Sequence, residues 1–111
     1  MPTAKPDGSN RSQESWSVAK PAILLSPRFY AALKHLSDVD FARVEAALQV
    51  IPDCFGHPHT HGGISIRRLR ENIFECRAGL KVRLLFRQNG NVLEFFFAGN
   101  HDDIRRVIQD L

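Results

Sequence analysis

The sequence contains little cysteine and no long apolar run. Cys54 and Cys76 are the only two cysteines among 111 residues, and they form neither a disulfide framework nor a CxxC redox pair. We interpret them as reduced thiols in the core of a cytosolic protein. No apolar stretch approaches the roughly 20 residues that span a bilayer, and the first twenty residues lack the apolar centre of a signal peptide. We therefore expect a cytoplasmic protein that does not contact a membrane.

Aliphatic side chains are scarce in residues 1–20, which are rich in proline, serine, glycine and asparagine. A segment of this composition cannot bury enough apolar surface to become ordered by itself. The rest of the chain has room for one modest hydrophobic core. We therefore expect a disordered tail over residues 1–20 and a single folded domain over residues 21–111.

The first part of this domain has the signals of a strand followed by two helices. The short apolar stretch Ala22–Leu25 predicts a buried strand, and Ser26 and Pro27 after it are typical of an N-cap and of the first helical position. Apolar residues then recur with helical spacing. Ser37 interrupts this pattern and is expected to cap a second helix, which Pro52 should end. Two helices joined by so tight a turn form a helical hairpin.

Beyond residue 63 the apolar period changes to two, which predicts strands. Gly79 marks a turn, the Asn89-Gly90 pair marks a hairpin, and Asn100 is expected to cap a final helix. Residues 92–98 are apolar on both faces apart from one glutamate, as is typical of a central strand. We therefore predict an α+β fold, in which an N-terminal strand and a helical hairpin pack on a twisted, mainly antiparallel sheet of three or four strands, and a short C-terminal helix follows.

Positive charge is concentrated between residues 63 and 87, where seven basic and two acidic residues give a local charge of +5 in a chain of net charge +3. Such an excess indicates a polyanion or an acidic protein as partner. Arg83 lies in a strand whose alternate residues point inward, so its guanidinium should emerge on the opposite face, with Arg77 of the preceding strand beside it. Two guanidiniums on one face can bind phosphate oxygens in pairs. The alternative is a solvated face with ion pairs to Glu75 and Glu94.

A series of short motifs runs through the second half of the chain. In order they are Arg68-Leu69, FECR at residues 74–77, the turn at Gly79, VRLLF at residues 82–86 and AGNH at residues 98–101. This series resembles the "KL", "ELR", glycine-turn, "YRVLY" and "GHR" motifs of the RelE/ParE superfamily of toxins from bacterial type II toxin-antitoxin systems. SPRFYAALKHL is similar to the first helix of that family. The resemblance covers nearly everything after the tail and implies a RelE-like version of the α+β fold.

The best-known members of the family are ribosome-dependent mRNA endonucleases. The resemblance therefore implies attack of an RNA 2′-hydroxyl on the adjacent phosphate, without metal or other cofactor. It implies that Arg83 stabilises the transition state, that Arg77 binds phosphate or supports the site, and that His101 is an acid or base, as suits an imidazole. The expected substrate-binding residues are Arg67, Arg68, Arg70, Lys81, His59 and His61.

The family also implies partners. We expect a cognate antitoxin, whose acidic or amphipathic segment covers the arginines, and mRNA on the ribosome; DNA is expected only through an antitoxin complex. Two features depart from the pattern of active relatives: no tyrosine follows the histidine motif, and Asp102 stands where a basic residue is usual. Two alternatives therefore stay open, a ParE-like inhibitor of DNA gyrase that catalyses nothing and an inactive relative that acts as a binding module.

Three histidines alternate in the stretch HPHTHGG: His57, His59 and His61. On a strand they would face the same way and could share a zinc ion. Pro58 and the paired glycines instead predict a loop. In a toxin of this family such a loop would lead into the first basic strand, where His59 or His61 could contact the RNA backbone. Metal binding, RNA binding and a loop without function all remain open for this segment.

Overall fold

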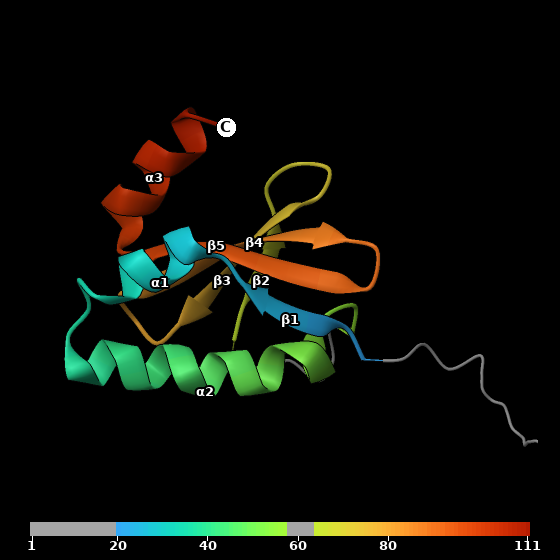
Figure 1. Cartoon of the computed structure of the whole chain (residues 1–111), viewed down its shortest axis with the longest axis horizontal. Coiled ribbons are helices and arrows are strands. Elements are labelled where there is room, and N and C mark those ends of the chain that lie inside the picture. Colours follow the sequence, from blue (N-terminus) through green and yellow to red (C-terminus); the bar gives the residue numbers. More distant parts are fainter. Residues whose placement is uncertain (1–19, 58–63) are drawn as a thin grey trace, which may run out of the picture.

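The computed structural model describes residues 20–57 and 64–111. The predicted tail, apart from Lys20, therefore lies outside the described residues, as do His59 and His61. No helix of the described part is long and apolar enough to cross a bilayer. Along the chain the elements are β1 (Ala22–Leu25), α1 (Pro27–Leu33), α2 (Asp38–Cys54), β2 (Ile66–Arg68), β3 (Ile73–Ala78), β4 (Val82–Asn89), β5 (Val92–Gly99) and α3 (His101–Gln109) (Figure 1).

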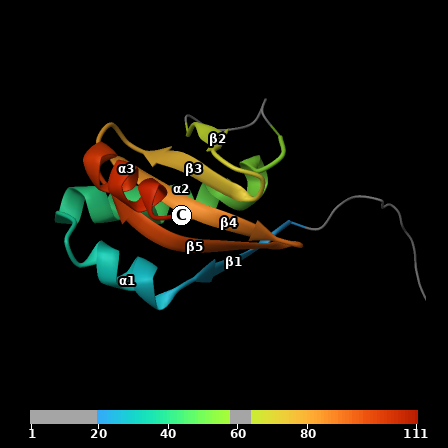
Figure 2. The same ribbon diagram turned by 90° about the horizontal axis from the view of Figure 1, so that it is seen from above.

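The five strands form one sheet in the order β1-β5-β4-β3-β2 (Figure 2). β1 runs parallel to β5, and the other three pairings are antiparallel. The mainly antiparallel sheet is therefore confirmed, with the N-terminal strand as its fifth member. The expectation that this strand is buried is wrong: β1 lies at an edge of the sheet, so Ile23 and Leu25 pack against the core while Leu24 is exposed.

Helices lie on both faces of the sheet. Buried residues of α1 and α2 pack with one face of the strands, whereas Ile104 and Val107 of α3 pack on the other face against Ile73, Leu85 and Phe96. Figure 1 shows α2 below the sheet and α3 above it, over one end of the strands. Because α3 is short, it covers only part of its face.

The predicted helix starts are confirmed. The Ser26 hydroxyl accepts a hydrogen bond from the backbone of α1, the Ser37 hydroxyl does the same for α2, and Asn100 forms a capping box with Asp103 at the start of α3. Pro52, however, does not end α2, which continues to Cys54. Proline fits the helical φ, and within the last turn its missing N–H removes only one intrahelical hydrogen bond.

Both predicted turns are confirmed, since Gly79 and Gly90 adopt φ values of +85° and +61° that favour glycine. Leu80 is almost fully exposed, because it lies in the turn after Gly79 and β4 begins only at Val82. A bulge opposite Leu85 and Phe86 interrupts the register between β4 and β5.

Phe86 stands at the centre of the core between the sheet and the helices α1 and α2. Its ring stacks on those of Phe74 and Phe95, with centroids 5.4 Å and 4.8 Å away, and meets Phe55 edge-on at 5.8 Å. It is fully buried. The ring therefore joins three strands and the end of α2 through one set of aromatic contacts.

We expect Phe86→Ala to lower the free energy of unfolding by about 3–5 kcal/mol, because the cavity opens among rings that cannot collapse into it. Phe41 is the matched control, since it is partly exposed on α2 and its replacement by alanine should cost less than about 1 kcal/mol. Urea denaturation of both variants measures the difference. Equal losses would contradict the central place of Phe86.

Candidate functional site

Arginines gather on the sheet face that carries α3. Arg77 of β3 and Arg83 of β4 are direct partners across their strands, so their side chains leave the sheet on the same side. Arg67 of β2 is paired in the same way with Glu75 of β3. Alternate residues such as Phe74 and Cys76 belong to the core on the other face. The apolar positions thus determine that these polar side chains share one surface.

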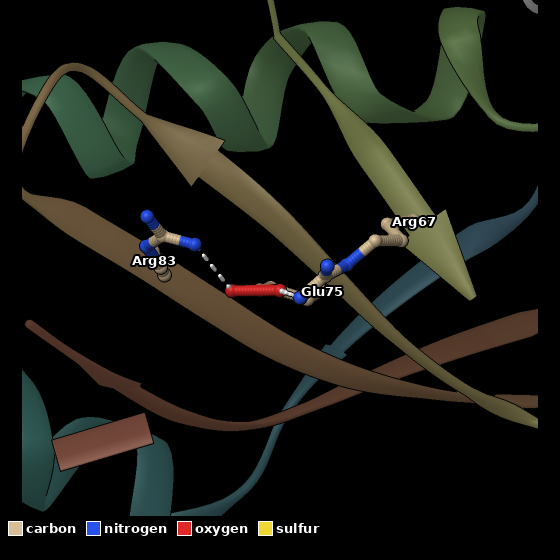
Figure 3. Close-up of polar contacts among 3 residues, drawn as sticks. All are labelled: Arg67, Glu75 and Arg83. Carbon is tan, nitrogen blue, oxygen red and sulfur yellow. Dashed lines mark hydrogen bonds and ion pairs between the residues drawn. The ribbon is translucent and has the colours of Figure 1, made fainter. Parts of the chain in front are cut away.

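Glu75 lies between two of the arginines and bonds to both (Figure 3). Arg67 donates from Nη2 to Oε1 at 2.7 Å, and Arg83 donates from Nη1 to Oε2 at 3.0 Å. The Glu75 side chain is only 5% exposed, against 21% for Arg83 and 66% for Arg67. A carboxylate this deeply buried requires compensating charge and hydrogen bonds, and the two guanidiniums supply both.

The same contacts decide the ionisation of Glu75. Burial raises the pKa of its carboxyl group, but the hydrogen bonds from Arg83 and Arg67 and the charges of both arginines lower it by more, so the net shift is downward. Glu75 is therefore a stable anion at neutral pH. A carboxylate with a lowered pKa and both oxygens engaged is a poor general base.

A hollow of about 190 Å³ lies among these side chains, lined by Ser65, Arg67, Glu75, Arg77 and Arg83. Three arginines and one glutamate give it a charge of +2. Arg77 is exposed and forms no ion pair with any carboxylate in the described part of the chain. Like charges directly opposite each other on neighbouring strands destabilise a sheet, so the pairing of Arg77 with Arg83 is unfavourable unless an anion lies nearby. The hollow is suited to a phosphate group, which guanidiniums bind through two oxygens at once.

Comparisons with known proteins find similarity to solved structures, but no protein-family model matches the sequence and no curated protein is significantly similar to it. A chain of the RelB-RelE antitoxin-toxin complex from Methanococcus jannaschii matches with a TM-score of 0.60 at 17% identity, over 76% of this chain and 96% of that one. A chain of the archaeal RelE-RelB complex from Pyrococcus horikoshii matches with a TM-score of 0.55 at 12% identity, over 73% of this chain and 94% of that one. YafQ from E. coli matches with a TM-score of 0.56 at 11% identity, over 76% of this chain and 97% of that one.

The chain has the RelE fold. The α+β architecture expected from the motif series is thereby confirmed. At identities of 11–17% the likeness is one of fold. A shared fold does not determine activity, which depends on the side chains that this chain places on it.

Other basic residues predicted for the site lie elsewhere in the RelE fold. Arg68 has its guanidinium 5.4 Å from the ring of Phe74, on the core side of β2, where it lines a separate hollow with His57. Lys81 lines another hollow, with residues of the turn between α1 and α2 and of the start of α3. Arg70 binds the C-terminal end of α3, donating to the carbonyl oxygens of Leu111 at 3.1 Å and Ile108 at 3.3 Å.

The histidines are not part of the arginine hollow as described. His101 is the first residue of α3, two positions beyond Gly99, the β5 partner of Arg83. Its side chain is exposed and does not line the hollow. His57 is described, whereas His59 and His61 lie outside the described residues. Within the described ranges no three histidine, cysteine or acidic residues lie close enough to hold a metal ion.

Sequence reasoning assigned Glu75 only to the alternative of a solvated face. The structure shows the ion pairs of that alternative, but Glu75 is buried and not solvated, and it bonds to arginines that also line the hollow. The alternation of β3 already placed Glu75 on the face of Arg77. What it could not give was the register that brings Arg67 opposite Glu75, since pairing between strands is not encoded locally.

The lowered pKa of Glu75 predicts a pH-dependent contribution to stability. Its carboxylate stabilises the fold above its ordinary pKa of about 4.5, and this stabilisation is lost as the pH falls through the lower pKa of the folded state. We expect the free energy of unfolding to fall more steeply on acidification below pH 4.5 in wild type than in Glu75→Gln, as measured by denaturant titrations between pH 6 and 3. Parallel curves would contradict the ionic pairing.

Arg70 is expected to act on α3. Replacing it with alanine removes the two side-chain hydrogen bonds to the carbonyl oxygens of Ile108 and Leu111 at the C-terminal end of α3. Amide hydrogen exchange in residues 104–111 should become several-fold faster, while exchange in β3 and β4 stays unchanged. Arg105→Ala, on the exposed side of the same helix, is the control and should leave exchange as in wild type. Unchanged exchange in Arg70→Ala would exclude this structural role.

Proposed function

We propose that this chain is the toxin of a type II toxin-antitoxin pair and that it cleaves mRNA on the ribosome. One observation carries the proposal: Arg77 and Arg83 are paired across β3 and β4, with Arg67 beside them, around a hollow of about 190 Å³. The likeness to chains solved in RelB-RelE complexes and to YafQ supports it. In this assignment the RNA backbone crosses the α3-bearing face of the sheet.

The reaction requires positive charge near the phosphate oxygens, a base for the attacking hydroxyl and an acid for the departing oxygen. The 2′-oxygen of the ribose bonds to the adjacent phosphorus as the bond to the departing 5′-oxygen breaks, which leaves a 2′,3′-cyclic phosphate. Arg83 and Arg77 neutralise the charge that builds up on the phosphate oxygens. His101, at the start of α3, donates the proton to the departing oxygen. The attacking hydroxyl gives its proton to a base that Glu75 cannot provide, because its oxygens are held by arginines.

The partners follow from the same surface. The antitoxin presents an acidic or amphipathic segment that covers the arginines and competes with RNA for them. Arg68, Lys81, His59 and His61 contact other parts of the RNA. The protein acts in the cytoplasm, where ribosomes are found, and associates with DNA only through the antitoxin.

A second candidate is a ParE-like inhibitor of DNA gyrase that binds without catalysis. The observation in its favour is that His101 is exposed and lies outside the arginine hollow, while α3 contains no tyrosine to serve in its place. In this case the arginines would bind an acidic surface instead of a scissile phosphate.

Purified protein added to ribosomes programmed with mRNA, followed by mapping of the new 3′ ends, tests the proposal. We expect cleavage by wild type, a loss of about 100-fold or more in Arg83→Ala because transition-state charge is left unbalanced, and a loss of about 100-fold in His101→Ala. Arg87→Ala is the matched control. Arg87 lies on the same face, but it pairs with Glu94 and stacks on Phe96, so cleavage should stay at the wild-type rate.

The mRNA cleavage assay and a gyrase supercoiling assay together distinguish the two candidates. If wild type leaves ribosome-bound mRNA intact but stops DNA supercoiling by gyrase, the second candidate is correct. Full cleavage by Arg83→Ala would reject the assigned chemistry even where the toxin function stands.

A further inference from the structure

The buried carboxylate of Glu75 connects three strands through side chains alone. It comes from β3, and its two oxygens bond separately to Arg67 of β2 and to Arg83 of β4 (Figure 3). Each guanidinium is therefore tied to a different oxygen of one rigid, planar group. The distance between the two guanidiniums is set by the width of that carboxylate and not by two independent flexible side chains.

Burial makes this connection effective for Arg83. An exposed arginine samples many rotamers, and a site built from such side chains must order them each time a ligand binds. Glu75 is 5% exposed and Arg83 21% exposed, so their bond is largely shielded from competing water. The Arg83 guanidinium donates through Nη1 to Glu75, and its other N–H groups stay available to a phosphate oxygen.

Glu94 belongs to an ion pair on the same face that is more exposed to solvent. It receives a hydrogen bond from Arg87 at 3.4 Å, and the two side chains are 32% and 36% exposed. Glu94 does not line the arginine hollow. Removal of either carboxylate raises the net charge of the chain by one, so the two glutamates form a matched pair that separates local geometry from overall charge.

We propose that Glu75 is the positioning residue of the phosphate site, where its carboxylate fixes the guanidiniums of Arg83 and Arg67 for an RNA phosphodiester and leaves Arg77 to meet the incoming anion. This inference rests on the proposed function and extends it. Glu75 touches no reacting atom; it acts through the arginines. It also lowers the charge of the hollow, so it improves geometry at some cost in attraction for the polyanion.

Glu75→Gln is therefore expected to slow cleavage without weakening binding. We expect kcat on ribosome-bound mRNA to fall at least about tenfold with KM unchanged or lower, because the arginines lose their fixed spacing. Binding of a fluorescein-labelled 2′-O-methyl hexaribonucleotide, which lacks the attacking hydroxyl, should be unchanged or tighter. Its dependence on salt should steepen by up to about 0.7 in the logarithmic slope, since one more cation is free to contact the strand.

Glu94→Gln is the control and should match wild type in kcat and in the salt slope of binding. Glu75→Asp retains the charge but is one methylene shorter, so it can bond well to only one of the two guanidiniums and should restore part of kcat.

Nitrogen-15 NMR of the arginine side chains adds a readout that is independent of activity. The Arg83 guanidinium signals, assigned with Arg83→Lys, should be resolved in wild type and averaged by rotation in Glu75→Gln.

Three results would overturn the positioning role: a kcat near wild type in Glu75→Gln, a fall in kcat that comes with equally weakened binding of the 2′-O-methyl strand, or Arg83 signals as ordered in Glu75→Gln as in wild type. If wild type itself cleaves no RNA, the proposed function fails. The NMR and binding experiments then still decide whether Glu75 fixes the arginines.

Discussion

The arginine-bearing face of this protein depends on one buried carboxylate shared by two guanidiniums. Burial raises the pKa of Glu75, and the hydrogen bonds and charges of Arg83 and Arg67 lower it by more, while the carboxylate in turn offsets the repulsion among the arginines. Removal of one partner from such a group leaves a buried charge uncompensated, which is more harmful than the absence of the whole group. The cluster is thus maintained as a unit, and its excess of positive charge is what an external anion meets.

The placement of α3 determines how much of this face is available. Its apolar side chains Ile104 and Val107 cover the apolar part of the sheet around Leu85, whereas the arginine hollow next to it stays open. The capping box at Asn100 orders the first turn of α3 and Arg70 binds its last turn. A predicted RNA-binding residue therefore bonds to the end of a helix, away from the arginine hollow, which it does not line.

Features with a local cause could be predicted from the sequence, and features that depend on distant pairing could not. The serine and asparagine caps, the Asn-Gly hairpin and the two-sided apolar pattern of β5 depend on residues within a few positions of one another. The edge position of β1 and the bond of Arg67 to Glu75 depend on which strands are neighbours and in what register. The same limit applies to the site: Arg77 and Arg83 could be placed together from alternation, whereas Arg68, Arg70 and Lys81 could be separated from them only by the structure.

Register links the core to the chemistry. On β3 and β4 the core residues alternate with the residues of the hollow, so a slip of one position would turn Arg77 and Arg83 inward and expose Phe74 and Phe86. The stacking of those two rings, with centroids 5.4 Å apart, opposes such a slip. The hydrophobic core therefore holds the arginines in position without contacting them. This explains how a chain can keep the RelE fold at 11–17% identity while the polar residues that the core places on the opposite face are free to differ.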